Sequence, residues 1–107
     1  MTHEVRWTEP AIKLLGEIAD QRIQRNLLEA AAELSTDPDK RGRRLTGNLA
    51  GYWSLHWSHY RIIYLIDEES DTVFVLAVGL RQEHKPRDIY QLAQRLLRRG
   101  LLEPPTE

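Results

Sequence analysis

Residues 53–64, WSLHWSHYRIIY, place side chains that can do chemistry among side chains that build strands. His56, His59 and Arg61 lie between aromatic and branched apolar residues. Histidine exchanges a proton near neutral pH, because its unperturbed pKa is about 6.5. Arginine never loses its charge, and its planar fork of donors matches the oxygens of a phosphate. The stretch therefore offers proton transfer and phosphate binding within one short segment.

A basic segment, KRGRR, follows the first third of the chain and contains Lys40, Arg41, Arg43 and Arg44. The formal net charge is only −1, but the first 39 residues have an acidic balance and the remainder a basic one. Charge sorted in this way can make one face of a protein positive. Basic loops supply much of the affinity for nucleic acid. The segment is therefore the best candidate for binding phosphates, and a plain solvated loop remains the alternative.

Length and composition restrict the class of protein. A chain of 107 residues has the size of one compact domain, and its 41% apolar content can form one core. The absence of cysteine excludes disulfides, thiolate metal sites and cysteine nucleophiles. No apolar run approaches the roughly 20 residues that span a bilayer, and the first residues do not resemble a signal peptide. We expect a cytoplasmic protein with no membrane partner.

The elements that must position these side chains can be predicted from periodicity. Residues 3–7 alternate polar and apolar as a short strand does, and Thr8 offers an N-cap ahead of Pro10. Apolar residues then recur at helical spacing up to a breaker cluster at 35–40, and we expect two helices divided near 16–20. Four strands should follow at 44–48, 52–57, 60–66 and 72–81, and a last helix between Pro86 and Gly100.

This order predicts an α+β fold, β-α-α-β-β-β-β-α, with a mainly antiparallel sheet and the helices packed on one face. Residues 1–100 would form the domain, and residues 101–107 a flexible C-terminal tail. Ser58 and His59 alone separate two strands, which predicts a hairpin. We expect His59 to face solvent in that turn, and His84 remains a further candidate in the loop before the last helix.

Side chains alternate between the two faces of a strand, so residues 52–57 can be sorted. Trp53, Leu55 and Trp57 should point toward the helices, while Ser54 and His56 should line the open face near Arg61. The tryptophans are therefore expected to belong to the core rather than to a platform for stacking bases.

Five stretches, in this order and spacing, resemble the RelE/ParE superfamily of bacterial type II toxins over nearly the whole chain. They are VRWTEPAIKLLGEI, RRLTGNLAGYW, YRIIYLID, VLAVGLR and DIY. The opening is more similar to the RelE branch, whose members cut messenger RNA on the ribosome, than to the ParE branch, whose members inhibit DNA gyrase. The resemblance implies a cognate antitoxin and ribosome-bound mRNA as partners, contact with DNA only through a toxin–antitoxin complex, and no metal or other cofactor.

Cutting RNA without a metal requires the ribose 2′-OH to attack its own phosphate. That proton must be removed, the charge-rich phosphorane stabilised, and the leaving 5′-oxygen protonated. Arg61 and Arg81 match positions where ribonuclease members of the family carry catalytic arginines. Tyr90 resembles the near-terminal tyrosine that stacks on a base or transfers a proton, although about three extra residues separate it from Arg81. Surface ion pairs for the arginines, and a place for Tyr90 at the rim of the last helix, are the alternatives.

The chain departs from the family at Ser54 and His56, which match positions usually occupied by Lys or Arg. Serine supplies no charge and does not titrate near neutrality. Histidine can carry a positive charge and can exchange a proton near neutral pH. We hypothesise that His56 replaces the missing basic residues as general acid or base and that Ser54 contributes only to RNA binding. A histidine that merely hydrogen-bonds or stacks is the alternative.

Three functions are therefore compatible with the sequence. The first is a ribosome-dependent endoribonuclease toxin. The second is a ParE-like inhibitor of gyrase, which needs no group that does chemistry and which the departures at Ser54 and His56 favour. The third is an inactive homologue that binds an antitoxin.

Overall fold

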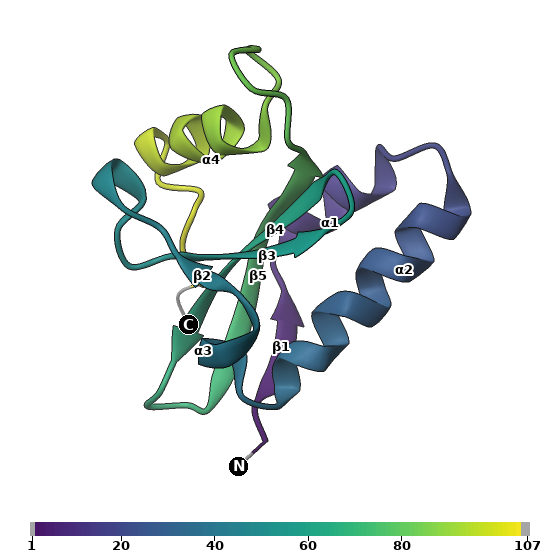
Figure 1. Ribbon diagram of the computed structural model, residues 1–107. Helices are drawn as coiled ribbons and strands as arrows, with labels where there is room; N and C mark the ends of the chain where they lie inside the picture. Colours follow the sequence, from purple (N-terminus) through teal and green to yellow (C-terminus); the bar gives the residue numbers. More distant parts are fainter. Residues whose placement is uncertain (1, 106–107) are drawn as a thin grey trace.

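A five-stranded sheet forms the centre of the protein, as the computed structural model of residues 2–105 shows (Figure 1). Its strands are β1 (Glu4–Trp7), β2 (Arg43–Arg44), β3 (Trp53–Trp57), β4 (Tyr60–Asp67) and β5 (Thr72–Leu80). They lie in the order β1-β5-β4-β3-β2, and only β1 runs parallel to its neighbour. The predicted α+β class and mainly antiparallel sheet are confirmed.

Four helices accompany the sheet: α1 (Glu9–Gly16), α2 (Gln21–Ala32), α3 (Pro38–Arg41) and α4 (Ile89–Arg98). Two short 3₁₀ turns, Glu33–Ser35 and Gly47–Leu49, complete the regular structure. The predicted order of the long elements is confirmed, and the break between α1 and α2 lies where it was expected. Helix α3 was not predicted, because four residues are too few to show a helical period.

Local hydrogen bonds fix where the first two helices begin. Asp20 Oδ1 accepts from the backbone N–H of Arg22 at 2.8 Å and of Ile23 at 3.3 Å, which caps α2. Thr8 occupies the N-cap position of α1 as predicted, but its hydroxyl donates to the carbonyl of Val75 at 3.1 Å. The start of α1 is thereby tied to β5 rather than capped by its own side chain.

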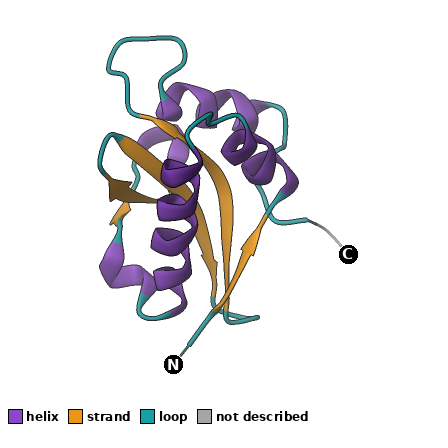
Figure 2. Cartoon of the chain, turned by 90° about the vertical axis from the view of Figure 1, so that its right-hand side faces the viewer, coloured by secondary structure: helices purple, strands orange, loops and turns teal. Residues whose placement is uncertain are grey.

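The helices cover both faces of the sheet, so the prediction that they share one face is wrong. Ile62 of β4 and Val75 of β5 pack with buried residues of α1 and α2, while the neighbouring Ile63 packs with Ile89 and Ala93 of α4. The physical reason is that β4 and β5 carry apolar side chains on both faces, and each face needs a cover. Figure 2 looks from the α2 side, with α2 lying in front of the sheet.

An irregularity in the pairing of β4 with β5 decides which face the end of β5 presents. Ile63 pairs with Ala77, whereas the next residue, Tyr64, pairs with Val75. Leu76 is the extra residue of this bulge, and Leu76 and Ala77 both join the cluster under α4. Gly79 consequently lies on the α4 face, where an added Cβ would stand 3.3 Å from Ile89 Cδ1.

The segment predicted to be a flexible tail, residues 101–107, packs on the domain at its start. Leu102 is buried in the α4-side cluster, and its carbonyl accepts a 2.6 Å hydrogen bond from the Tyr52 hydroxyl. The prediction is therefore wrong for this residue, and residues 106–107 lie outside the described part of the chain. None of the helices formed by residues 2–105 has the length and apolar character needed to cross a membrane.

Tyr64 connects the core to the basic segment and makes a test of the fold possible. Its side chain is fully buried, and its hydroxyl donates to the carbonyl of Pro38 at the start of α3, at 2.7 Å. Burial raises the pKa of Tyr64 from 10.0 to about 12. The folded protein therefore keeps this proton after the unfolded chain has lost it. The stabilisation is complete below pH 10 and is lost as the pH rises through 12.

We expect Tyr64→Phe to reduce the free energy of unfolding at pH 8 by about 1–3 kcal/mol, because a buried carbonyl loses its donor. The same variant should show a shallower loss of stability between pH 10 and 12 than the parental protein. Urea unfolding across that range measures both effects. Tyr60→Phe, on the same strand, is the matched control for loss of a tyrosine hydroxyl and should lower the free energy of unfolding at pH 8 by less than Tyr64→Phe does; an unchanged pH profile in Tyr64→Phe would contradict the assignment.

Candidate functional site

His56 and Arg61 lie side by side on the α4 face of the sheet. They are register partners in the β3–β4 pair, and Arg61 in turn pairs with Gly79 of β5. Directly opposed residues of antiparallel strands point to the same face, so the predicted placement of His56 near Arg61 is confirmed. The opposite orientation of Trp53, Leu55 and Trp57, toward the side of α1 and α2, is confirmed as well.

Arg61 forms no ion pair with any acidic side chain of residues 2–105. Its Nη1 donates to two backbone carbonyls of the hairpin turn, Ser58 at 3.2 Å and Tyr60 at 2.9 Å. Within residues 2–105, no carboxylate lies within 4.0 Å of its guanidinium. Within the described residues, Arg61 therefore does not form the surface ion pair that was the alternative to a catalytic role. His56 beside it is exposed, so an incoming group can reach both side chains.

Arg81 follows β5 and is tied to the same end of the sheet. Its backbone N–H donates to the carbonyl of His59 in the hairpin turn at 2.7 Å. Its guanidinium makes a 2.6 Å ion pair from Nη1 to Asp88 Oδ1 and a looser one of 3.6 Å from Nη2 to Glu83. The ion-pair alternative is thus realised here. The side chain remains 31% exposed, so part of its fork of donors still faces outward.

Asp88 belongs to the candidate site although it was not predicted from the sequence. It is only 2% exposed and also accepts from the backbone N–H of Gln82 at 2.6 Å and of Tyr90 at 3.0 Å. Burial alone would raise the pKa of Asp88, but the hydrogen bonds from Arg81, Gln82 and Tyr90 together hold it below its ordinary value. The bond to Asp88 raises the pKa of Arg81 in return. The available signal was an Asp directly before an apolar helix.

Tyr90, in the first turn of α4, links Arg81 to β3. The Arg81 guanidinium lies over its ring at 4.9 Å, and its hydroxyl is 2.9 Å from Ser54 Oγ. Ser54 is 2% exposed, so the expectation that it lines an open face is wrong. The reason is that α4 covers this part of the sheet and Tyr90 closes over the serine. Binding of RNA by Ser54 remains a prediction and would require that cover to move.

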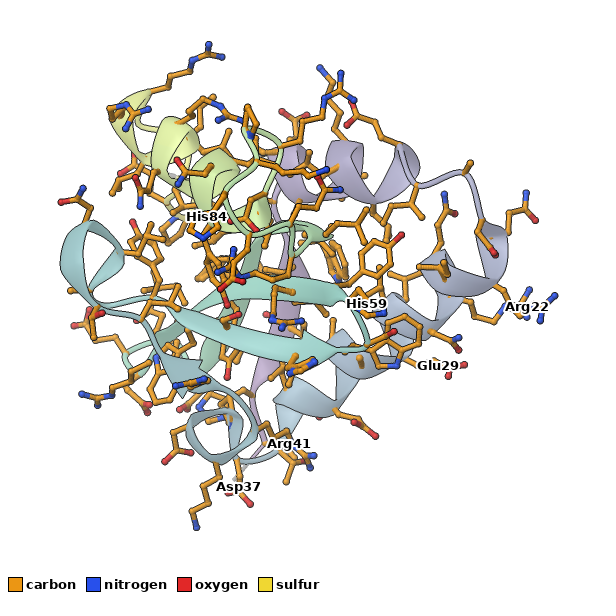
Figure 3. All side chains as sticks on the ribbon, turned by 45° about the horizontal axis from the view of Figure 1, so that its top comes forward. Arg22, Glu29, Asp37, Arg41, His59 and His84 are labelled. Atoms are coloured by element: carbon orange, nitrogen blue, oxygen red, sulfur yellow. The ribbon has the colours of Figure 1, made fainter. Side chains whose placement is uncertain are left out.

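The other histidines of interest lie at the rim. His59 is exposed in the β3–β4 turn, and His84 is exposed in the loop between Arg81 and Asp88 with a backbone φ of 64°. Figure 3 shows His84 beside α4 and His59 near the end of the hairpin, both away from Arg41 and Asp37 at the α3 end. The solvent-facing position predicted for His59 is confirmed.

The basic segment is divided between two faces of the sheet. Arg43 pairs with Ser54 and so shares the α4 face, whereas Arg44 pairs with Trp53 and lies 5.2 Å over that indole ring. Lys40 and Arg41 belong to α3 instead, and Arg41 Nε donates to the carbonyl of Thr36 at 2.6 Å. Of the four basic residues predicted to bind RNA, only Arg43 is placed by register on the face of His56 and Arg61.

A possible metal-ligand group is separate from this site. His3, Glu68 and Asp71 bring their ligand atoms within 4.8 Å of one another. They lie where β1 begins and where the turn joins β4 to β5, whereas Arg61 and Arg81 lie at the opposite end of those strands. This group therefore has no part in the chemistry around Arg61.

This chain is similar to toxins of type II toxin–antitoxin systems. A family model described as ParE toxin of type II toxin-antitoxin system, parDE, matches residues 5–84. Toxin RelG of Mycobacterium tuberculosis is 32% identical over 83 residues, which cover 78% of this chain and 95% of RelG.

Two solved structures show the same fold. The toxin–antitoxin complex RelBE2 of M. tuberculosis contains a chain that is 35% identical, with a TM-score of 0.71, over 76% of this chain and 93% of that one. A variant of Escherichia coli toxin RelE in the free state is 19% identical, with a TM-score of 0.70, over 92% and 98% of the two chains.

The division of the basic segment leads to a test with two matched variants. We expect Arg43→Ala to weaken binding of a single-stranded RNA and to lower the slope of log affinity against log salt by about 0.7, because one phosphate contact is lost. Arg44→Ala should leave that slope unchanged and reduce the free energy of unfolding by about 0.5–1 kcal/mol, since a cation–π contact is removed. Fluorescence anisotropy across a salt series measures the slope; equal slopes for both variants would contradict the division.

Proposed function

The chain belongs to the ParE toxin family of type II toxin–antitoxin systems, within the RelE/ParE superfamily, and on that premise we propose that it is an endoribonuclease that cuts messenger RNA on the ribosome. The observation that carries the proposal is the pair of Arg61 and His56. The exposed His56 is the register partner of Arg61, and no carboxylate of residues 2–105 lies within 4.0 Å of the Arg61 guanidinium. The donors of Arg61 that the backbone carbonyls of Ser58 and Tyr60 do not use suit an anion, because a guanidinium matches the geometry of phosphate oxygens.

The proposed reaction is attack of a ribose 2′-OH on the adjacent phosphate, with loss of the 5′-oxygen. Arg61 would donate to the non-bridging oxygens as negative charge accumulates on the phosphorane. The outward donors of Arg81 would join it from the neighbouring strand end. His56 would accept the 2′-OH proton or return a proton to the leaving 5′-oxygen. Tyr90, whose ring already stacks beneath Arg81, would position a base or the leaving group.

The departure from the family at Ser54 fits this assignment. A neutral serine bonded to the Tyr90 hydroxyl occupies a position where relatives of the ribonuclease type usually carry a positive charge. The site therefore relies on its arginines for charge and on His56 for proton transfer. Ser54 contributes by holding Tyr90, which is a role that its burial allows.

We propose a cognate antitoxin as the protein partner, because several structural relatives were solved as toxin–antitoxin complexes. Its binding would regulate access to the α4 face. Contact with DNA would then occur only through that complex, and a ribosomal substrate implies action in the cytoplasm.

Gyrase inhibition is the second candidate, favoured by the ParE description of the matching family model and by the lost basic residues at Ser54 and His56. An inactive homologue that binds an antitoxin is the third. A supercoiling assay with purified gyrase and a translation assay with mapped RNA ends separate the three, since each candidate predicts a different pair of results.

The arginines can be tested for chemical and structural roles at once. We expect Arg61→Ala and Arg81→Ala each to lower kcat for ribosome-dependent cleavage by about 10²–10³, as the loss of a preorganised donor does. Arg61→Ala should change the free energy of unfolding by no more than about 0.5 kcal/mol. Arg81→Ala should reduce it by about 1–3 kcal/mol, because the buried Asp88 loses a donor.

Arg61→Lys is the control that keeps the charge and removes the fork, and it should recover only part of the rate. Parental rates in both alanine variants would end the assignment of these residues to cleavage.

His56 requires a different substitution. His56→Gln keeps a hydrogen-bonding side chain that cannot take up or release a proton, so kcat should fall by about 10²–10⁴. His59→Gln, in the exposed turn, should leave the rate unchanged. If His56→Gln cuts RNA at the parental rate, His56 takes no part in the reaction and the proton transfers need another group.

A further inference from the structure

Asp88 joins three segments that would otherwise be independent. Its Oδ1 accepts from the Arg81 guanidinium and from the Gln82 N–H, both at 2.6 Å, and its Oδ2 accepts from the Tyr90 N–H at 3.0 Å. These donors come from the end of β5, the loop after it and the first turn of α4. One carboxylate therefore fixes where Arg81 lies and where α4 begins.

The arrangement requires an ionised carboxylate. Three N–H groups point at two oxygens, and a protonated acid would set its own hydrogen against one of those donors. Such a group, 2% exposed, needs this full set of partners to remain in the interior. The donor set, and not exposure to water, keeps it charged.

The contact changes what Arg81 can do. A free arginine side chain samples many rotamers, and a ligand that fixes it must oppose that conformational entropy. Asp88 holds Nη1, so the side chain is already restricted before any ligand binds. The guanidinium then rests 4.9 Å from the Tyr90 ring, and Nε and Nη2 are not bound to Asp88.

We propose that Asp88 is a positioning residue that orients Arg81 and Tyr90 together for the reaction, acting through its buried contacts and never touching the RNA. This inference rests on the proposed ribonuclease function. If Asp88 only capped α4, its substitution would have no effect on catalysis through Arg81. If Asp88 instead restrained the enzyme by neutralising Arg81, its substitution would increase the rate.

Three substitutions separate these readings. Asp88→Ser keeps an oxygen that can cap α4 at the Tyr90 N–H but is too short to hold Arg81. Asp88→Asn keeps the shape and one acceptor while removing the charge. Glu83→Gln is the matched control, because Glu83 contacts the same arginine at 3.6 Å from a side chain that is 73% exposed.

We expect Asp88→Ser to lower kcat about 10–10²-fold with a small change in KM, since misplacement of a group by about 1 Å can cost that much. Asp88→Asn should fall between this variant and the parental protein, and Glu83→Gln should match the parental protein. In an Arg81→Ala background, Asp88→Ser should cause no further loss, because the residue through which it acts is gone. Parental or faster turnover in Asp88→Ser, or an undiminished loss in the Arg81→Ala background, would overturn the proposal.

A measurement without RNA keeps this test apart from the proposed function. Nitrogen NMR of the arginine side chains should show a restrained Arg81 guanidinium in the parental protein and a freely rotating one in Asp88→Ser, while the backbone amides of α4 stay ordered. If the parental protein cuts no RNA, the ribonuclease proposal fails, and this comparison alone decides whether Asp88 orients Arg81. If Asp88→Ser loses α4, the same comparison is made with Asp88→Asn, where an Arg81 guanidinium more mobile than in the parental protein supports the inference and one restrained to the parental degree overturns it.

Discussion

The buried carboxylate of Asp88 is the interaction on which the candidate site depends. Helix α4 covers an apolar sheet face, yet burial of Ile89 and Ala93 alone does not determine where the helix begins. The three hydrogen bonds at Asp88 determine it, and they attach the helix to the strand end that carries Arg81. The same bonds bring Tyr90 over Ser54. The same hydrogen bonds therefore determine both the position of α4 and the geometry of the candidate site.

The two faces of the sheet differ in how completely helices cover them. On one, α1 and α2 bury a continuous apolar surface that includes Ile62 and Val75. On the other, α4 covers only part of the surface and leaves the end of the β3–β4 hairpin accessible, with exposed His56 and half-buried Arg61. Arg61 has no acidic partner in the described part of the chain, and its charge is tolerated there because water reaches it. The α4 face therefore combines a buried apolar cluster with an accessible end that carries the candidate site.

Much of this architecture could be predicted from the sequence, because it depends on short-range patterns. Alternation within residues 52–57 gave the correct faces for Trp53 and His56, and a two-residue gap gave the hairpin. Other features depend on contacts far apart in the chain. Ser54 is buried because α4 packs over it. The face on which Gly79 lies depends on a bulge at Leu76, which no local sequence motif predicts. The apolar runs of β4 and β5 did hold one overlooked signal, since strands apolar on both faces require cover on both.

The cleavage proposed for this toxin proceeds by attack of the ribose 2′-OH, and the chemistry of the cut RNA ends identifies that step. Purified protein would be incubated with ribosomes translating a defined message, and the termini of the fragments would be identified. We expect cleavage within the ribosome-bound message that leaves a 2′,3′-cyclic phosphate on one fragment and a 5′-hydroxyl on the other. Intact message accompanied by inhibited gyrase, or fragments that carry a 5′-phosphate, would contradict attack by the 2′-OH.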